Sequence, residues 1–355
     1  MVATLLHNKP MGYPPDPINY EYDFEPEIGE VLDILPGLKW LRLPLPFMLG
    51  HINVWLLQDG DGWAVVDTGI SSSITRQTWE GVFSSQLDNA RLTRVLVTHL
   101  HPDHAGCAGW LCEYFDVELH MTRDEYLLCR ILVSDTGLPP PREGQRFYRA
   151  AGFAEEDMSR YIEMFGSFGK IVGQLPRAYY RLHEDRPIRI GGQEWRVITG
   201  HGHSPEHACL YSPKQNVLIS GDQVLPTISP NVSVYPTEPA ANPLAGWFDS
   251  LHRMKTLLPD DVLVLPSHGK PFRGVKGRLD ALIEEHVTGL DKLRQLCREP
   301  QRAVDVFPAL FKSEITDSNL MMATGEAIAH LNFLLYEGEL SFKTDQSGCR
   351  WYQTR

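Results

Sequence analysis

The chain has 355 residues, 43% of them hydrophobic, which is enough for one large domain or a domain with an appendage. No apolar run approaches the roughly 18 residues of a membrane span, and the N-terminus has neither a signal-peptide apolar region nor a small-residue cleavage site. The net charge of −12 disfavours nucleic acid as a partner, and six scattered cysteines without a CxxC pair indicate no disulfide framework and no zinc ribbon. We therefore expect a cytoplasmic protein without a membrane partner.

Residues 1–37 are rich in Pro, Tyr and acidic residues and are predicted to form an irregular arm. Between residues 38 and 69, apolar runs separated by Gly-Asp turns are typical of a β-meander. Residues 123–178 read as a helical insertion in which aromatic residues are frequent. Between these two regions, hydrophobic periodicity predicts helices over 75–87 and 105–115 and strands over 92–97 and 117–121.

Strands resume after Arg181 and are followed by a loop rich in Pro, Ser and Asn over 226–243 and a helix over 244–258. Two β-rich halves, each ending in strand-then-helix units, predict an α/β fold with two sheets packed face to face and helices outside. The tail from Gly277 reads as a long helix, two shorter helices and a β-wing. The predicted domains are the arm 1–37, a catalytic domain 38–275 with its insertion 123–178, and a C-terminal domain 276–355.

The stretch THLHPDHAG, Thr98 to Gly106, carries four ligand-type residues directly after an apolar strand. Imidazole and carboxylate together suit borderline divalent metals such as zinc. His99 and His101 are two residues apart and can point to the same side, whereas Asp103 and His104 are adjacent and diverge. This loop is therefore expected to serve two neighbouring metal ions.

Further ligands are needed to complete two sites, and three candidates also follow apolar strands. They are His203 in GHGHSPEH, Asp222 in SGD and His268 in SHG. Because a carboxylate has two oxygens, Asp222 is the natural residue to be shared between two metal ions.

This series of residues resembles the metallo-β-lactamase superfamily, whose pattern is an early Asp, then HxHxDH, then a His, a bridging Asp and a last His. The resemblance covers about residues 38 to 275 and implies an αββα sandwich with two metal ions, zinc being favoured and iron or manganese left open. It assigns His99, His101 and His203 to one ion and Asp103, His104 and His268 to the other, with Asp222 between them. The early Asp is Asp67, which is expected to orient a ligand or the metal-bound water.

The family's Thr-Pro-Gly-His is here Gly200-His201-Gly202-His203, which leaves His201 as a candidate for contact with a ligand or the substrate. His207 is expected to be structural. Asp222 in place of a Cys and His101 in place of a Glu separate this chain from thiolate-using lactamases and from the diiron branch. The retained set resembles the binuclear hydrolases, including glyoxalase II-like thioesterases and lactone hydrolases.

The resemblance implies hydrolysis by a hydroxide that bridges the two metals, with no Ser or Cys nucleophile. Asp103 or Asp222 would carry a proton toward the leaving group. The insertion is expected to cover the site as a lid, and its aromatics either line the pocket or pack the insertion's own core. If they line it, the substrate is an ester, thioester or lactone with an apolar acyl part.

The tail resembles the winged-helix domain of lactamase-beta-2-type members, some of which cleave single-stranded RNA, so an endoribonuclease is the alternative function. Residues 291–355 hold eight Lys or Arg against nine Asp or Glu, which provides no basic face for nucleic acid. We expect a small-molecule acyl substrate, and the tail to pack against the lid or against a second subunit in a homodimer.

Overall fold

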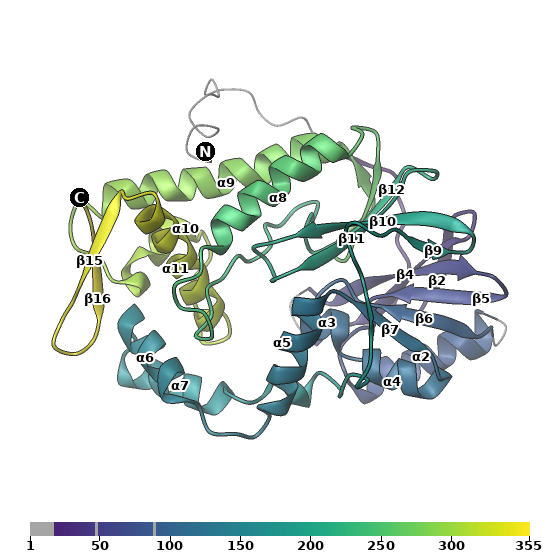
Figure 1. The fold of residues 1–355 in the computed structure, drawn as a ribbon, viewed down its shortest axis with the longest axis horizontal. Coiled ribbons are helices and arrows are strands. Elements are labelled where there is room, and N and C mark those ends of the chain that lie inside the picture. Colours follow the sequence, from purple (N-terminus) through teal and green to yellow (C-terminus); the bar gives the residue numbers. More distant parts are fainter. Residues whose placement is uncertain (1–17, 47–48, 88–89) are drawn as a thin grey trace.

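The structure, a computed structural model, describes residues 18–46, 49–87 and 90–355. Two seven-stranded sheets lie face to face, and helices cover both outer faces (Figure 1). The first sheet, in spatial order, consists of β2 (Val31–Leu35), β3 (Leu38–Pro44), β4 (His51–Asp59), β5 (Gly62–Val66), β6 (Leu92–Leu96), β7 (Glu118–Met121) and β8 (Tyr180–Arg181). The second consists of β1 (Asn19–Tyr20), β14 (Phe272–Arg273), β13 (Leu263–Pro266), β12 (Val217–Gly221), β11 (His207–Ser212), β10 (Gln193–Gly200) and β9 (Ile188–Ile190).

The outer helices of the first sheet are α2 (Ser73–Ser85) and α4 (Ala108–Phe115), and those of the second are α8 (Pro243–Leu257) and α9 (Val275–Leu296), as Figure 1 shows. The insertion holds α5 (Arg123–Ser134), α6 (Arg142–Ala151), α7 (Glu155–Met164) and the 3-10 turn Phe168–Lys170. The tail holds the 3-10 turn Ala303–Val306, α10 (Phe307–Leu310), α11 (Leu320–Tyr336) and the hairpin of β15 (Leu340–Thr344) and β16 (Arg350–Thr354). The predicted αββα sandwich is confirmed.

Alternation along the strands distributes the apolar side chains between three cores. In β4, Trp55 and Leu57 join the core between the sheets, while Val54 and Leu56 join the core under α2 and α4. Because successive side chains of a strand point to opposite faces, a strand buried on both sides must be apolar throughout. The continuous apolar runs in the sequence have this origin.

Regular structure begins before Leu38, so the predicted irregular arm is wrong for part of its length. β2 pairs antiparallel with β3, and β1 pairs with β14 across more than 250 residues of sequence. β1 obtains its hydrogen bonds from a distant partner, which local composition cannot reveal, whereas β2 forms a hairpin with β3 across Pro36-Gly37, a turn signal that the sequence does contain. Residues 1–17 of the arm lie outside the described residues.

The helix predicted over 105–115 is two helices, α3 (Pro102–Ala105) and α4. Pro102 begins α3 at its first position, where a fixed φ and a missing N–H are favourable. The break follows because the Cys107 N–H donates to Gly69 O, at 2.9 Å, instead of continuing the helical ladder. The metal-ligand motif therefore lies partly within a helical turn rather than wholly in a loop.

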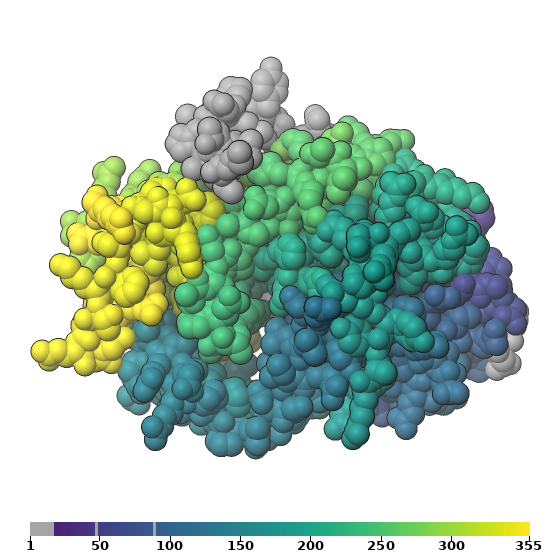
Figure 2. Space-filling view, viewed as in Figure 1, coloured from purple at the N-terminus to yellow at the C-terminus, as the bar shows by residue number. Residues whose placement is uncertain are grey.

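The insertion packs against the tail. Phe147, Tyr148 and Tyr161 of α6 and α7 are buried in one core with residues of α8, α9 and α11, so these aromatics pack rather than line a pocket. The guanidinium Nε of Arg160 lies 3.2 Å from the carboxylate of Asp317. Figure 2 shows the surface hollowed between α5, α6 and the chain near residue 240. The tail's hairpin follows its helices as predicted, whereas a winged-helix function stays a prediction.

Across the described residues, no helix has the length and apolar character needed to cross a membrane. All six cysteines are buried and free. Burial raises the pKa of the Cys107 thiol to about 11, and its Sγ lies against Ile70 O. A buried thiol of raised pKa is a packing residue rather than a nucleophile, in keeping with the expected mechanism without a Cys nucleophile.

Candidate metal centre

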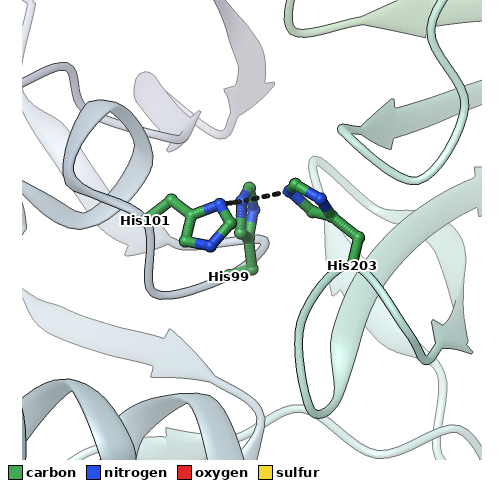
Figure 3. Close-up of side chains that lie close together, drawn as sticks. All are labelled: His99, His101 and His203. Atoms are coloured by element: carbon green, nitrogen blue, oxygen red, sulfur yellow. Dashed lines mark hydrogen bonds between the residues drawn. The ribbon is translucent and has the colours of Figure 1, made fainter. Parts of the chain in front are cut away.

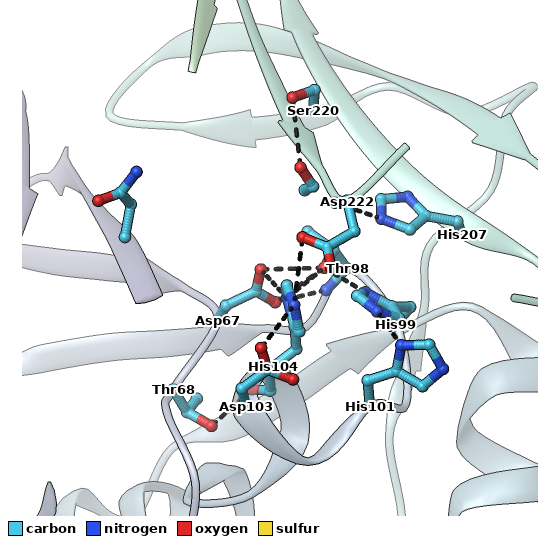
Figure 4. A network of polar contacts seen from close by, with 12 residues as sticks. Asp67, Thr68, Thr98, His99, His101, Asp103, His104, His207, Ser220 and Asp222 are labelled. Carbon is cyan, nitrogen blue, oxygen red and sulfur yellow. Dashed lines mark hydrogen bonds and ion pairs between the residues drawn. The ribbon is translucent and has the colours of Figure 1, made fainter. Parts of the chain in front are cut away.

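The carboxyl ends of five strands bring the predicted ligands together at one edge of the sandwich. Strands β5 and β6 are parallel neighbours in the first sheet, as are β12 and β13 in the second, so each pair ends at the same edge. Figure 4 shows Asp67, His104 and Asp222, from the ends of β5, β6 and β12, pointing toward one another. The residues concerned are Asp67 after β5, His99, His101, Asp103 and His104 after β6, His203 after β10, Asp222 after β12 and His268 after β13.

Three imidazoles form the histidine cluster: His99, His101 and His203 (Figure 3). His99 Nε2 lies 2.9 Å from His101 Nδ1 and 3.3 Å from His203 Nε2. Nitrogen ligands of zinc lie about 2.0–2.1 Å from the ion, so in a tetrahedral site they are about 3.4 Å from one another. The distances between these nitrogen atoms are therefore close to those between the ligands of a tetrahedral zinc site.

Asp103, His104 and His268 form the mixed cluster. Asp103 Oδ2 lies 3.2 Å from His268 Nε2 and 3.6 Å from His104 Nε2. Both imidazoles turn the same nitrogen, Nε2, toward the carboxylate. One divalent ion could be reached by all three side chains.

Asp222 lies between the two clusters and divides its oxygens between them. Its Oδ1 is 3.5 Å from His104 Nε2 and 3.6 Å from His268 Nε2, while its Oδ2 is 3.7 Å from His203 Nε2. Such an arrangement suits a carboxylate shared by two ions.

The other nitrogen of each of three ligating imidazoles is held by a neighbour. His104 Nδ1 is 2.8 Å from Asp67 Oδ2, His203 Nδ1 is 2.8 Å from Asn231 O, and His268 Nδ1 is 3.0 Å from His51 O. These contacts place the proton on Nδ1 and leave Nε2 as a lone-pair donor.

Unpaired polar atoms show that the residues fit a metal. The buried atoms His104 Nε2, His268 Nε2 and Asp222 Oδ1 make no hydrogen bond with any described residue. Orphaned buried polar atoms are costly, and three that converge are expected where a cation is bound. The set of imidazoles and carboxylates suits zinc, iron or manganese.

The pKa values of the histidines differ between the two clusters. Burial, together with four surrounding histidines, holds the pKa of His99 well below its ordinary value, and burial lowers that of His101 to about 3. Neutral imidazoles of this kind are ready to bind a metal. Burial also opposes the charged form of His104, but Asp103, Asp222 and Asp67 outweigh it and hold its pKa well above the ordinary value. The carboxylates thus make the mixed cluster attractive to a cation.

Two other histidines considered in the sequence do not belong to either cluster. His201 is exposed, and its Nδ1 lies 2.6 Å from Pro205 O, so it does not face the centre. His207 is buried; its Nε2 accepts from the Asp222 N–H at 3.1 Å, and its ring stacks on His99. His207 is structural as expected, and it also fixes the backbone of Asp222.

Three residues that hold the candidate metal ligands in place could not be found from the sequence: Glu125, Asn231 and His51. Glu125 is in the first turn of α5, where an acidic residue is unremarkable because it complements the helix dipole. Asn231 and His51 act through their backbone carbonyls, which side-chain patterns cannot show.

Comparisons with known proteins agree with this geometry. Residues 48–268 match the family model of the metallo-beta-lactamase superfamily, and residues 290–355 match that of the metallo-beta-lactamase-like C-terminal domain. A beta-lactamase domain protein from Burkholderia ambifaria has a similar crystal structure, with 42% identity, a TM-score of 0.87 and coverage of 95% of this chain and 98% of that one. A probable metallo-hydrolase of Bacillus subtilis is 24% identical over 83% of this chain and 91% of its own length.

Two more distant relatives carry thioesterase names. An atrochrysone carboxyl ACP thioesterase of Aspergillus fumigatus is 25% identical over 72% of this chain and 47% of its own length. An acyl-coenzyme A thioesterase of Homo sapiens is 24% identical over 53% of this chain and 63% of its own length. With the family model matched over more than half of the chain and the centre assembled at the expected edge, this protein belongs to the metallo-beta-lactamase superfamily.

Proposed function

We propose that this metallo-hydrolase cleaves a carboxylic ester, thioester or lactone with an apolar acyl part, using two divalent ions held by the two clusters. The metal centre supports hydrolysis, and the surface beside it supports the substrate class.

Exposed apolar side chains beside the centre are the observation that carries the substrate class. Tyr235 and Met322 are 46% and 51% exposed. Met322 O accepts hydrogen bonds from Asn231 Nδ2 at 3.4 Å and from Ser233 Oγ at 3.2 Å, and Asn231 O in turn holds His203. Apolar surface that stays exposed next to a polar centre favours an apolar ligand. The hollow beside α5 in Figure 2 would receive the acyl part.

When bound, the two ions would supply a water of lowered pKa and a Lewis acid for the carbonyl oxygen. The protein's part is to hold the ligating atoms and to move protons. Asp103 is the more exposed of the two central carboxylates, with 17% of its side chain accessible against 11% for Asp222. We assign to Asp103 the transfer of a proton toward the leaving group, and to Asp222 the bridging position.

Asp67 has an orienting role in this proposal. Its carboxylate accepts from the Thr98 N–H and from His104 Nδ1, both at 2.8 Å, and it is fully buried. It therefore holds His104 from behind, away from the substrate side.

The names of two relatives support the thioester variant of the proposal, although their identities to this chain are only 24–25%. An RNA substrate has less support, since the tail carries more acidic than basic residues, nine against eight over residues 291–355. The alternative is retained as an outcome of the test.

The test is a panel of acyl thioesters, esters and lactones of increasing chain length, with single-stranded RNA, against the metal-loaded protein. We expect turnover of apolar acyl substrates that is lost in Asp222→Ala and kept in Asp260→Ala, an exposed position remote from the centre. RNA should stay intact. Cleavage of RNA but of no acyl substrate would replace this proposal with the endoribonuclease.

A further inference from the structure

Glu125, on helix α5 of the insertion, joins the two loops that carry the histidine cluster. The residue is fully buried. Its Oε2 accepts the Leu100 N–H at 2.9 Å and its Oε1 accepts the Glu206 N–H at 2.8 Å. Leu100 lies between His99 and His101, and Glu206 lies three residues after His203. One carboxylate thus bonds to the backbone of both loops that carry the three histidines.

The two loops belong to different sheets. The loop of His99 and His101 follows β6 of the first sheet, and the loop of His203 joins β10 to β11 of the second. Their ligand atoms lie only 3.3 Å apart, between His99 Nε2 and His203 Nε2. The spacing of the histidine cluster therefore depends on how the sheets are held together at this edge. A backbone bond from the Ala208 N–H to Thr98 O, at 2.8 Å, lies next to the Glu125 contacts and shares this task.

The start of α5 is itself anchored to the second loop. Thr122 Oγ1 donates to Glu206 O at 2.6 Å, and the Asp124 N–H donates to Glu206 Oε2 at 3.0 Å. The guanidinium of Arg181 lies 3.1 Å from Glu206 Oε1. These contacts fix the start of α5 and therefore the Glu125 carboxylate, which in turn fixes the Leu100 N–H.

A carboxylate is the side chain that can do this, because each of its two oxygens accepts from a different loop. A glutamine has the same shape but only one acceptor oxygen. Its amide nitrogen would face a backbone N–H, leaving one loop without its bond.

We propose that Glu125 is a positioning residue that holds the Leu100 and Glu206 backbones at the spacing the histidine cluster needs to bind a metal ion. This inference rests on the proposed function for the presence of an ion in that cluster. It assigns to the insertion a structural part in the metal centre.

The test compares Glu125→Gln with Asp124→Asn, which removes a charge from the exposed neighbouring position of the same helix. Metal content and chelator competition with Zn²⁺ report the affinity of each equivalent, and Co²⁺ substitution reports the ligand geometry by its visible spectrum. We expect Glu125→Gln to lose affinity for one of two equivalents by about 10–100-fold, as for other residues that orient ligands, and to change the Co²⁺ spectrum. Asp124→Asn should match the wild type.

Thr122→Val provides a second variant if Glu125→Gln does not fold. It removes the hydrogen bond from Thr122 Oγ1 to Glu206 O that anchors α5, and it leaves the Glu125 carboxylate in place. Circular dichroism and thermal unfolding of the metal-free proteins establish folding. Folded Thr122→Val should show a smaller loss in the same equivalent. Folded variants that bind both equivalents with wild-type affinity and spectrum would overturn the inference. Because none of these readouts uses a substrate, a wild type that binds two ions but hydrolyses nothing in the panel would defeat the proposed function alone.

Discussion

Replacement of Asp67 by asparagine is a sharp test of how the mixed cluster is oriented. In the wild type, Asp67 accepts from the Thr98 N–H and Thr98 Oγ1, and its Oδ2 lies 2.8 Å from His104 Nδ1. An asparagine oxygen can keep the Thr98 contacts, but its amide N–H₂ then faces His104 Nδ1–H. His104 relieves the conflict by moving its proton to Nε2, which is the atom turned toward Asp103 and Asp222. The ligand lone pair is lost without a change of shape.

The magnitude follows from the single charged hydrogen bond that is removed. Such bonds contribute about 1.5–3 kcal/mol, and each 1.4 kcal/mol is a factor of ten in affinity. We expect the affinity of the mixed cluster for Zn²⁺ to fall by about 10–100-fold, which agrees with the usual cost of losing a residue that orients a ligand. The histidine cluster should keep its affinity because none of its three members bonds to Asp67.

The assay is chelator competition on purified protein with metal content determined in parallel. Asp116→Asn is the matched control, because Asp116 also has a left-handed backbone, with φ 53° against 67° for Asp67, but is exposed and far from the centre. Asparagine tolerates this conformation, so backbone strain is the same in both variants. Wild-type affinity for both equivalents in Asp67→Asn would refute the tautomer argument, as would an equal loss in Asp116→Asn.

Three other predictions concern stability. Burial raises the pKa of Glu326 to about 7, so its protonated form stabilises the fold, and this contribution is complete below pH about 4.5 and is lost as pH rises through 7. In urea unfolding, the free energy of unfolding of Glu326→Gln should rise relative to that of the wild type by up to about 3 kcal/mol between pH 5 and pH 8. A pH-independent difference would contradict this. Gly221 has φ 52°, and an added Cβ would lie 2.5 Å from His207 Cε1, whereas a Cβ added at Gly192, which has φ 75°, would meet nothing within 4 Å. Gly221→Ala should therefore lower Tm more than Gly192→Ala does. Equal shifts in Tm would exclude the His207 contact as the cause. Zn²⁺ at a hundredfold excess over its Kd should stabilise the folded protein by about 2.7 kcal/mol in thermal unfolding, and Asp222→Ala should gain less; equal gains would place the ion elsewhere.

The two-sheet sandwich and the convergence of eight residues at one edge could be predicted because both depend on local signals. Apolar runs such as INVWLL mark strands buried on two faces, and the candidates from Asp67 to His268 lie in the short segments that follow such runs. The start of regular structure, the break between α3 and α4 and the fate of the insertion's aromatics could not be read in this way. β1 pairs with a distant strand, Cys107 bonds to Gly69, and Tyr148 packs with residues of the tail.

The sequence by itself determined which atoms are available to a metal, since the donor chemistry of THLHPDHAG and of the three later strand ends is a property of the residues. Only the tertiary structure decided how those atoms are held. Asp222 divides its two oxygens between the clusters because the edges of two sheets meet there. Asn231 and His51 orient His203 and His268 through backbone carbonyls, and Glu125 spans two loops more than 100 residues apart. Every residue carries the same backbone carbonyl, and every residue but proline the same N–H, so their long-range partners are chosen by packing and leave no trace in the order of side chains.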